Sequence, residues 1–376
     1  MNFEEDRKEE LEKTNDTLEV KEDDEMSRVK RKKKSKKKKI KIVIVIVLLL
    51  VIGVLAFLAF GMKEEPKKAP KKKKVTKEEA KVQIVDLSST SRPYAVMINN
   101  NKAVWGYQAG IQDAYITYEI VVEGGITRMM AVFKDRNTER IASVRSSRHY
   151  YLDYALENDA IYCHIGWSPQ AQHDISALGI NNIMDGAYTW DNSIRLDREH
   201  RAYTTMEKLK AAAEKRKYRT TSDKKLLLKY SAKSIDLSKE EGVIAANTVR
   251  IPYSTGHTTS YSYDPEAKVY KRFQNNIEHK DYVTKAQYTA KNIITYKVHN
   301  YPLNDEVGKG RQGINNIGSG EGYFISEGYA VPITWEKKSR SEQTVYKIKS
   351  TGKELVVNDG NTFIQIQPDS QSLTIE

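Results

Sequence analysis

The sequence predicts an extracytoplasmic protein of two domains: an α+β or α/β mixed domain over residues 92–225 and a smaller, mostly β domain over 245–376. A single N-terminal transmembrane helix is predicted to precede both domains. Three patterns support this prediction: an uncharged apolar run near the N-terminus, apolar runs mixed with helical patterns in the first domain, and closely spaced β-rich runs in the second. The length of 376 residues fits two domains of roughly 150 residues each.

The apolar run predicts a membrane anchor. Residues 42–62 carry no charge, and as a helix at ~1.5 Å per residue they span ~31 Å, the thickness of a bilayer core. The run is longer than the core of a cleavable secretory signal. Eleven Lys and Arg residues over 28–41 predict a cytoplasmic N-terminus. The sequence therefore predicts a single-pass signal anchor in the cell membrane, with a disordered cytoplasmic tail over 1–41 and the rest outside.

The positive charge is concentrated in the tails. Residues 1–27, 28–41 and 63–81 carry net charges of −8, +11 and +5, which leaves +4 of the total +12 for the rest of the chain. Because the basic run adjoins the apolar run, its expected partners are membrane lipids, and no nucleic acid is expected. Residues 63–91 are rich in Lys, Glu and Pro and predict an extended linker. The single cysteine, Cys163, lies far from the anchor, so no lipid-bearing cysteine is expected there.

Strand and helix patterns are mixed in the first domain. Five apolar runs bounded by Gly, Asn or charged residues predict strands at 94–98, 115–122, 129–133, 141–144 and 160–165. Three other stretches predict helices near 147–158, 169–178 and 205–217. This mixture predicts an α/β or α+β domain, followed by a connector over 226–244.

The second domain is predicted to be a sandwich or barrel. From residue 245 onward the helical patterns fade, and Tyr, Val, Ile and Thr dominate runs such as TVRIPY, NIITYKVH and TFIQIQP. Turn residues separate these runs at intervals of about 8–12 residues, which is typical of an all-β domain.

A hairpin is predicted over residues 118–128. Its Gly124-Gly125 pair can supply the positive φ angles of a two-residue turn. This turn places Val121 opposite Arg128, so the side chain of Arg128 is expected on the same face as the acidic residues of the first strand.

Two glutamates of this hairpin are candidate catalytic residues. Glu119 and Glu123 lie on one strand face with Arg128 diagonally between them, but at ~3.3 Å per residue their backbones are ~13 Å apart. That distance exceeds the carboxylate separation of a glycosidase pair. One of them could act as an acid with another carboxylate, such as Asp159. The alternative is structural, with Arg128 bridging both carboxylates.

A candidate anion site follows the fourth predicted strand. In residues 144–149, VRSSRH, Arg145 and Arg148 flank a predicted helix start with a serine cap. Free backbone N–H groups and two fixed positive charges together favour a phosphate or a carboxylate. The alternative is that both arginines pair with Asp153, Glu157 or the hairpin glutamates.

Two histidines complete the candidate site. His164 is the third candidate catalytic residue, because it lies near the carboxyl end of a predicted strand, where open α/β sheets usually bind ligands; a hydrogen-bonded core histidine is the alternative. The Ser168-Pro169 pair after it predicts a helix cap and not a nucleophile. His200 and Arg201 lie in a polar loop that could join the same crevice. The scattered histidines and the absence of HExxH or CxxC predict neither a metal nor a cofactor.

Several segments together resemble one family. They are RPYAVMINN, AYITYEIVVEGGITRMMAVF, ASVRSSRHYYLDYALENDAIYCHIGWSPQA, HRAYTT, GSGEGYFISEG, PITWEKKSR and GNTFIQIQP. In this order they resemble the YerB-like family of bacterial envelope proteins over about residues 92–376. The resemblance implies two domains outside the membrane of mainly Gram-positive bacteria, and no known activity. Many members look like lipoproteins, and this chain differs by carrying an apolar run in place of a lipid-bearing cysteine.

The motif positions that the resemblance carries over are Glu119, Glu123, Gly124, Gly125, Arg128, Arg145, Arg148, His164, Ser168, His200, Gly320, Trp335 and Arg340.

Three functions are compatible with these patterns. The first is a membrane-anchored extracytoplasmic protein that binds an anionic wall or envelope ligand through Arg128, Arg145 and Arg148. The second is a peptidoglycan-acting glycosidase or lytic transglycosylase that uses Glu119 or Glu123 as an acid of raised pKa. The third is a non-catalytic scaffold for another envelope protein. The possible partners are therefore membrane lipids, a cell-wall polymer or an envelope protein.

Overall fold

The computed structural model describes residues 44–54, 81–304 and 308–376. The chain divides into two units, residues 1–77 and 78–376, and the second contains every strand described below.

The predicted transmembrane helix is corrected by the structure. Residues 44–54 are helical. Within the described ranges, no helix combines the length and the apolar character needed to cross a membrane. The predictions of a single-pass signal anchor and of a cytoplasmic N-terminus depended on this helix and are wrong as well. Residues 42–43 and 55–62 of the predicted span, the predicted tail over 1–41 and residues 63–80 of the predicted linker lie outside the described residues.

Three α-helices lie close to their predicted positions. They are α2 (His149–Glu157), α3 (Pro169–Ala177) and α4 (Met206–Lys215). The side chain of Ser168 accepts a hydrogen bond from the N–H of Ala171, and Thr205 caps α4 in the same way. The predicted serine cap of α2 is wrong, because the residue before this helix is Arg148, whose side chain makes no capping bond.

One large sheet contains strands from both predicted domains. Its eleven strands run in the order β10-β20-β19-β16-β23-β2-β3-β1-β5-β6, with β21 paired to β20. Five come from the first segment: β1 (Tyr94–Asn99), β2 (Ile116–Val121), β3 (Thr127–Phe133), β5 (Ile161–Cys163) and β6 (Asn182–Ile183). Six come from the later segment: β10 (Ile244–Ala245), β16 (Asn292–Val298), β19 (Gly318–Ser326), β20 (Tyr329–Lys337), β21 (Val345–Ile348) and β23 (Thr362–Pro368).

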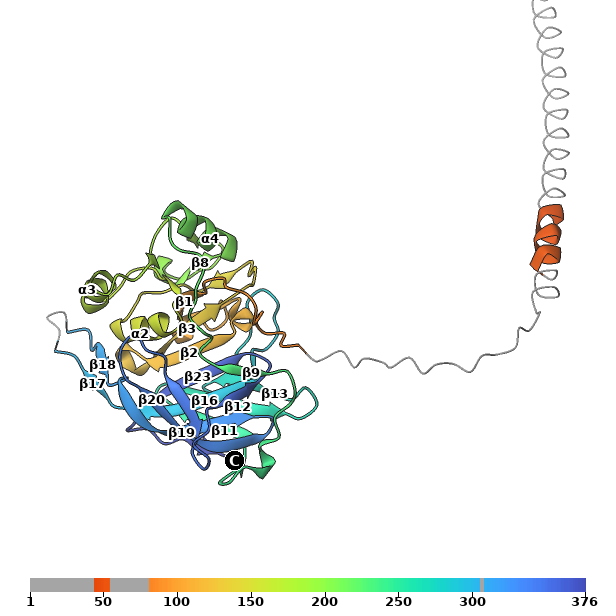
Figure 1. The fold of residues 1–376 in the computed structure, drawn as a ribbon. Helices are drawn as coiled ribbons and strands as arrows, with labels where there is room; N and C mark the ends of the chain where they lie inside the picture. The colour runs from red at the N-terminus through yellow and green to blue at the C-terminus, as the bar shows by residue number, and fades with distance from the viewer. Residues whose placement is uncertain (1–43, 55–80, 305–307) are drawn as a thin grey trace, which may run out of the picture. The chain divides into compact units, whose positions relative to one another are not determined.

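The two segments join where β2 pairs in parallel with β23, from Ile116 opposite Thr362 to Ile120 opposite Ile366. Figure 1 shows these strands side by side, with α2, α3 and α4 gathered beside β1, β2 and β3. The described chain is mostly β with few helices, which corrects the predicted fold class of a mixed domain behind a membrane helix. The predicted domain boundaries, 92–225 and 245–376, stay a prediction, because one sheet contains strands from both segments.

A smaller sheet covers one face of the large one. It contains β11 (Thr248–Pro252), β12 (Thr258–Asp264), β13 (Val269–Gln274), β14 (Ile277–Glu278), β15 (Thr289–Ala290) and β24 (Thr374–Ile375). Side chains alternate along β2, so its two faces meet different partners. Glu119 contacts Thr259 of β12, whereas Tyr118 donates to Glu157 of α2. The large sheet is therefore packed between α2 and the smaller sheet.

Short strands complete the fold. They pair as β4 (Ile141–Ala142) with β8 (Ala202–Thr204) and β7 (Thr189–Trp190), β9 (Lys229–Ser231) with β22 (Val356–Asn358), and β17 (Asn300–Pro302) with β18 (Gln312–Ile314).

Candidate functional site

The candidate residues gather at one edge of the large sheet. Strands β1, β2, β5, β16 and β23 run in the same direction, as their pairings show. Their carboxyl ends therefore lie at one edge, where ligands bind in open sheets of this kind. Asn99 ends β1, Glu123 follows β2 and His164 follows β5. Arg128 lies near the start of the antiparallel β3, which brings it to the same edge.

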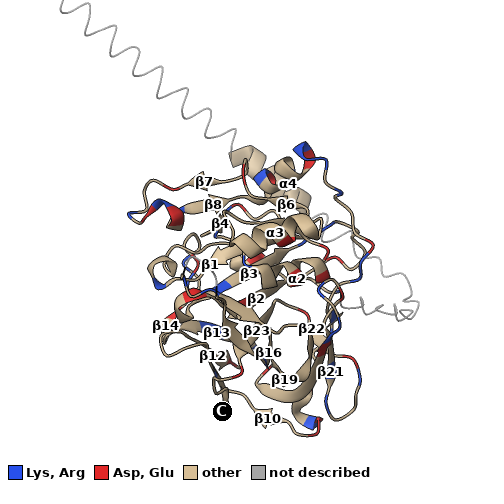
Figure 2. Ribbon diagram, turned by 90° about the vertical axis from the view of Figure 1, so that its left-hand side faces the viewer, with Lys and Arg blue, Asp and Glu red and all other residues tan. Residues whose placement is uncertain are grey.

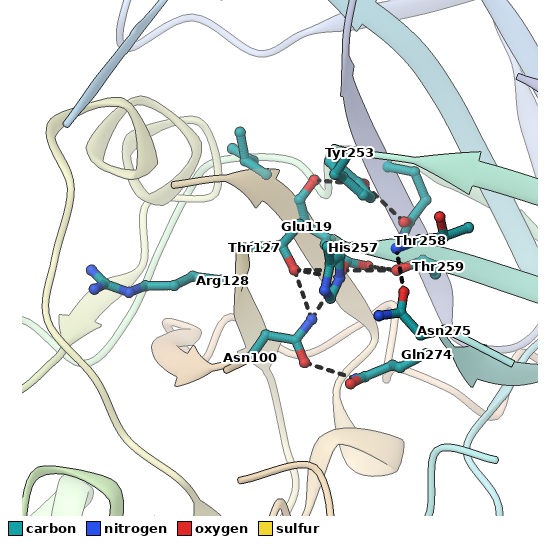
Figure 3. Close-up of polar contacts among 12 residues, drawn as sticks. Asn100, Glu119, Thr127, Arg128, Tyr253, His257, Thr258, Thr259, Gln274 and Asn275 are labelled. Carbon is teal, nitrogen blue, oxygen red and sulfur yellow. Dashed lines mark hydrogen bonds and ion pairs between the residues drawn. The ribbon is translucent and has the colours of Figure 1, made fainter. Parts of the chain in front are cut away.

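Glu119 occupies a closed, fully buried polar cluster in the middle of β2 (Figure 3). Arg272 donates to its Oε2 at 2.7 Å, and the hydroxyls of Thr127 and Thr259 donate to Oε1 at 2.7 and 2.9 Å. The Glu119 cluster comprises this carboxylate and the five side chains in contact with it, Asn100, Thr127, His257, Thr259 and Arg272.

The Glu119 cluster keeps its carboxylate ionised. Burial alone would raise the pKa of Glu119, but the charge of Arg272 and the hydrogen bonds of His257 and Thr127 hold it well below its usual range. Behind Arg272, the His279 ring contacts its guanidinium and the amide oxygen of Gln108. Burial and the Arg272 charge lower the pKa of His279, so this ring stays neutral. Each group is enclosed by protein, which leaves the cluster no open side for a ligand.

The predicted hairpin register is wrong by one residue. Thr127 lies opposite Val121, and Arg128 lies opposite Ile120. The turn contains the short helical segment Glu123–Gly125 instead of two glycines alone. Because a slip of one residue exchanges the faces of a strand, Arg128 points away from Glu119 (Figure 3). It therefore does not lie between the two glutamates.

Glu123 and three arginines form a second group, here called the arginine cluster. The carboxylate of Glu123 pairs with the Nε of Arg148. It also lies 3.7 Å from Nη2 of Arg128 and 3.9 Å from Nε of Arg311. Arg128 donates to the backbone oxygen of Ser146 at 2.7 Å. In Figure 2, basic and acidic positions adjoin one another around β1, β2 and β3.

The arginine cluster opens on a cleft of about 180 Å³. Arg148 and Arg311 line it, together with Ser168 and Pro169 at the start of α3. The other lining residues are His149, Gln170, Leu303 and Gln312. Guanidinium groups and a helix N-terminus both attract anions. The cleft can therefore hold an oxyanion beside Glu123.

Electrostatic repulsion within the arginine cluster is visible at Arg128. Burial and the neighbouring charge of Arg148 lower the pKa of Arg128 to about 10, although Glu123 opposes this shift. Its Nε is buried without a hydrogen-bond partner. Burial would raise the pKa of Glu123, but Arg148 and Arg128 lower it overall. Arg128 and Arg148 thus share one carboxylate, and the charge of Arg148 opposes that of Arg128.

The remaining predicted site residues lie outside this group. Arg145 pairs with the more exposed Glu199 at 3.0 Å, and the same carboxylate lies 3.7 Å from His200. Asn99 contacts the other ring nitrogen of His200 at 2.9 Å. Arg201 donates to the side chain of Asn192, at 3.4 Å. Arg145 is close enough to Arg128 to contribute to its lowered pKa.

His164 is a core histidine in this structure. Its side chain is fully buried, and its ring nitrogens contact the backbone oxygen of Gly166 and the amide of Asn182 at 2.8 and 3.0 Å. Burial lowers its pKa to about 4, so the ring is neutral near pH 7. The structure does not bring His164 to the glutamates. Across the described ranges, no group of three or more His, Cys, Asp or Glu side chains could hold a metal ion.

Two larger clefts lie elsewhere, and their charged residues are largely paired. One of about 460 Å³ lies beside α4, where Lys134 donates to the backbone oxygen of Ser91. Another of about 440 Å³ lies beside β9 and β21, where Lys229 pairs with Glu354. These pairings favour the arginine cluster as the candidate site.

Sequence reasoning missed Arg272, Thr259 and Arg311. A signal for Arg272 existed, because the alternation along β13 places it on the inward face between Tyr270 and Gln274. An arginine at an inward position requires a buried carboxylate partner.

The fold and the site together define a β-rich protein of two sequence segments that share one sheet beside an arginine-lined cleft. Two domain families match the chain, described as "Protein of unknown function (DUF3048) N-terminal domain" over residues 81–219 and "Protein of unknown function (DUF3048) C-terminal domain" over 249–364. The chain belongs to this two-domain family of unknown function.

A curated relative and a solved structure agree with this assignment. The chain is 28% identical over 292 residues to the "Putative lipoprotein YerB" of Bacillus subtilis (strain 168), covering 76% of this chain and 83% of the relative. The crystal structure of the YerB protein from Bacillus subtilis matches with a TM-score of 0.65 and 27% identity, over 76% of this chain and 94% of that chain. The relative's name describes a lipid-attached protein, which also conflicts with the single-pass topology predicted above.

Proposed function

We propose that this protein binds an anionic group of a cell-envelope ligand at the arginine cluster. The observation that supports this most directly is the position of Arg148, which pairs with Glu123 and also lines the cleft at the start of α3. A guanidinium group recognises carboxylate and phosphate oxygens through two parallel hydrogen bonds. At the N-terminus of α3, Pro169 has no N–H and the N–H of Ala171 donates to Ser168, so this helix end contributes the N–H of Gln170 and its dipole.

The electrostatics of the site support an anionic ligand. Arg128 and Arg148 share the carboxylate of Glu123, and Arg145 pairs separately with Glu199. Repulsion between Arg128 and Arg148 contributes to the lowered pKa of Arg128. An added oxyanion beside Arg148 would offset this repulsion, which would favour its binding.

The location of the protein is proposed by similarity to the Bacillus subtilis relative. The Bacillus subtilis relative is named as a lipoprotein, and a lipoprotein is held at a membrane surface by its lipid. By similarity we place the unit of residues 78–376 outside the membrane. A wall polymer or another envelope component that carries phosphate or carboxylate groups is then the ligand class within reach.

The geometry gives less support to an enzyme that uses a hairpin glutamate. A general acid needs a raised pKa, so that it still holds its proton near neutral pH. The pKa values of both Glu119 and Glu123 are lowered, the first well below its usual range. Glu119 is also enclosed. Both side chains are held as carboxylates, which suits ion pairing.

The test is a binding measurement on the full chain. The probes are poly(glycerol phosphate), polyglutamate and neutral dextran, compared by calorimetry at low and high salt. We expect binding of at least one polyanion, weaker at high salt, and none of dextran. Arg148→Gln should abolish most of the binding. Arg250→Gln, which alters an exposed arginine of β11, is the matched control and should bind like the wild type. Equal binding by the Arg148 and Arg250 variants would contradict the proposal.

A further inference from the structure

Glu123 already occupies the position of an anion in the arginine cluster. Its Oε1 pairs with Arg148 and lies 3.9 Å from Arg311, while its Oε2 lies 3.7 Å from Arg128. The side chain is 18% exposed, unlike that of the enclosed Glu119. One carboxylate therefore lies close to both arginines that line the cleft, Arg148 and Arg311, and to Arg128 behind them.

The backbone that carries Glu123 allows its side chain to leave. Glu123 lies in the turn between β2 and β3 and not within the paired strands. The next residue, Gly124, has a φ of +67°, and a Cβ added to it would meet no atom of the rest of the protein within 4 Å, so nothing packs against this side of the turn. Gly125 is fixed to the protein, since its backbone oxygen accepts a hydrogen bond from Ser254 at 2.7 Å. A rotation of the Glu123 side chain would leave the ladder between β2 and β3 intact.

We infer that Glu123 is an internal counter-ion that occupies the arginine cluster in place of the ligand, and that an oxyanion binds by displacing it from Arg148. This inference rests on the proposed function and adds the competitor that regulates the site. The ligand chemistry is an oxyanion with two oxygens available to one guanidinium, which a phosphate or a carboxylate can supply.

A displaced counter-ion has the opposite mutational signature to a ligand contact. If Glu123 helped to hold the ligand, removing its charge would weaken binding. If Glu123 competes, the ligand no longer has to break its ion pair with Arg148. A partly exposed ion pair of this kind corresponds to a ~2–5-fold gain in affinity when it is removed.

The experiment compares Glu123→Gln with the wild-type full chain. Inorganic phosphate and acetate are titrated separately, and binding is followed by calorimetry and by the shift in thermal unfolding. We expect ~2–5-fold tighter binding of the preferred anion by the variant. Glu321→Gln is the matched control, because Glu321 is exposed, pairs with Lys349 and does not line the cleft. It should bind like the wild type. The two anions distinguish a phosphate source from a carboxylate source.

A second variant, Glu123→Asp, tests the inference if Glu123→Gln does not fold. Glu123→Asp keeps the charge but shortens the side chain by one methylene, so its reach to Arg148 is reduced and anion affinity should also rise. Weaker or unchanged anion binding by both folded variants would overturn the inference that Glu123 is a displaced counter-ion. If Arg148→Gln still loses binding, the proposed function stands. If the wild type, Glu123→Gln and Glu123→Asp all bind neither anion, the counter-ion inference fails, and the polyanion titration decides the proposed function. Binding by a Glu123 variant alone supports both.

Discussion

Glu119 and Glu123 lie four positions apart in the chain, and their surroundings are opposite. Glu119 lies within β2, faces the smaller sheet and is fully buried, with Arg272 and four other side chains around its carboxylate. Glu123 lies in the turn after β2, reaches several arginines and remains partly exposed beside a cleft. In the first cluster the donors surround one anion, and in the second Arg128 and Arg148 share one. The position of a carboxylate in the strand or in the turn decides whether it stabilises the fold or regulates a site.

The energetic roles of the two carboxylates follow from this difference. A buried ion pair adds little compared with apolar side chains, but breaking it leaves a charge without compensation. A partly exposed ion pair is solvated on one side, so both its presence and its loss change the free energy of unfolding little. Variants of the two glutamates should therefore separate stability from binding.

The largest effect is expected from Glu119→Gln. The variant leaves Arg272 buried with no opposite charge, so the free energy of unfolding should fall by ~3–5 kcal/mol. Urea titration of the full chain measures this change. Glu278→Gln, which alters an exposed glutamate paired with Lys280, should change stability by less than ~1 kcal/mol. A similarly small loss for Glu119→Gln would contradict the assigned role.

The partner of Glu119 can be tested with a double variant. Glu119→Leu combined with Arg272→Met removes both charges, so no isolated charge remains in the core. The combined loss should be smaller than the sum of the two single losses by at least ~1 kcal/mol. Additive losses would show that the two side chains act independently.

Acid should weaken the fold through Glu119. Because its pKa is lower in the folded protein, its contribution is present above the unfolded pKa of about 4.3 and is lost as the pH falls through that value toward the folded pKa. The urea midpoint of the wild type should therefore fall more steeply below pH 4.5 than that of Glu119→Gln. Parallel curves for the two proteins would argue against this linkage.

A smaller effect is expected in the turn between the two clusters. Gly124 and Gly125 both have positive φ angles. An added Cβ at Gly125 would lie 2.8 Å from Ser254, whereas one at Gly124 would meet no atom within 4 Å. Gly124→Ala should cost about 1 kcal/mol of stability and Gly125→Ala about 2 kcal/mol or more. Thermal unfolding of the two variants gives the comparison, and the reverse order would be inconsistent with this turn geometry.

The smallest change in stability is expected from Glu123→Gln. The free energy of unfolding should shift by less than ~1 kcal/mol in urea titration, because the lost ion pair is partly exposed. A loss as large as that of Glu119→Gln would remove the contrast between the two clusters.

Local sequence patterns predicted the helices. The hairpin register and the contacts between distant strands could not be predicted from local patterns. The start of α3 followed from Ser168 and Pro169, because a cap and a first-turn proline act within a few residues. The hairpin register did not follow, since Gly-Gly fits both a two-residue turn and the longer turn that includes Glu123. The shift of the register by one residue places Arg128 on the opposite face of the sheet from Glu119. Arg128 therefore does not bridge the two glutamates.

The partners of Glu119 could not be predicted, because they come from strands far along the chain. Thr259 and Arg272 belong to β12 and β13, more than a hundred residues after β2. The sequence did identify Arg148 as a candidate anion contact and Glu123 as one of its possible partners. The membrane prediction failed because it rested on the length and hydropathy of one run.

The parallel pairing of β2 with β23 has a consequence for the order in which the chain can fold. Residues 116–121 are synthesised early, but the strand that completes their edge ends only at Pro368, near the C-terminus. Until that strand arrives, β2 exposes unpaired N–H and C=O groups of the kind that recruit foreign strands. Such long-range closure also slows folding. The emerging chain therefore needs protection from self-association until its last strands have been made.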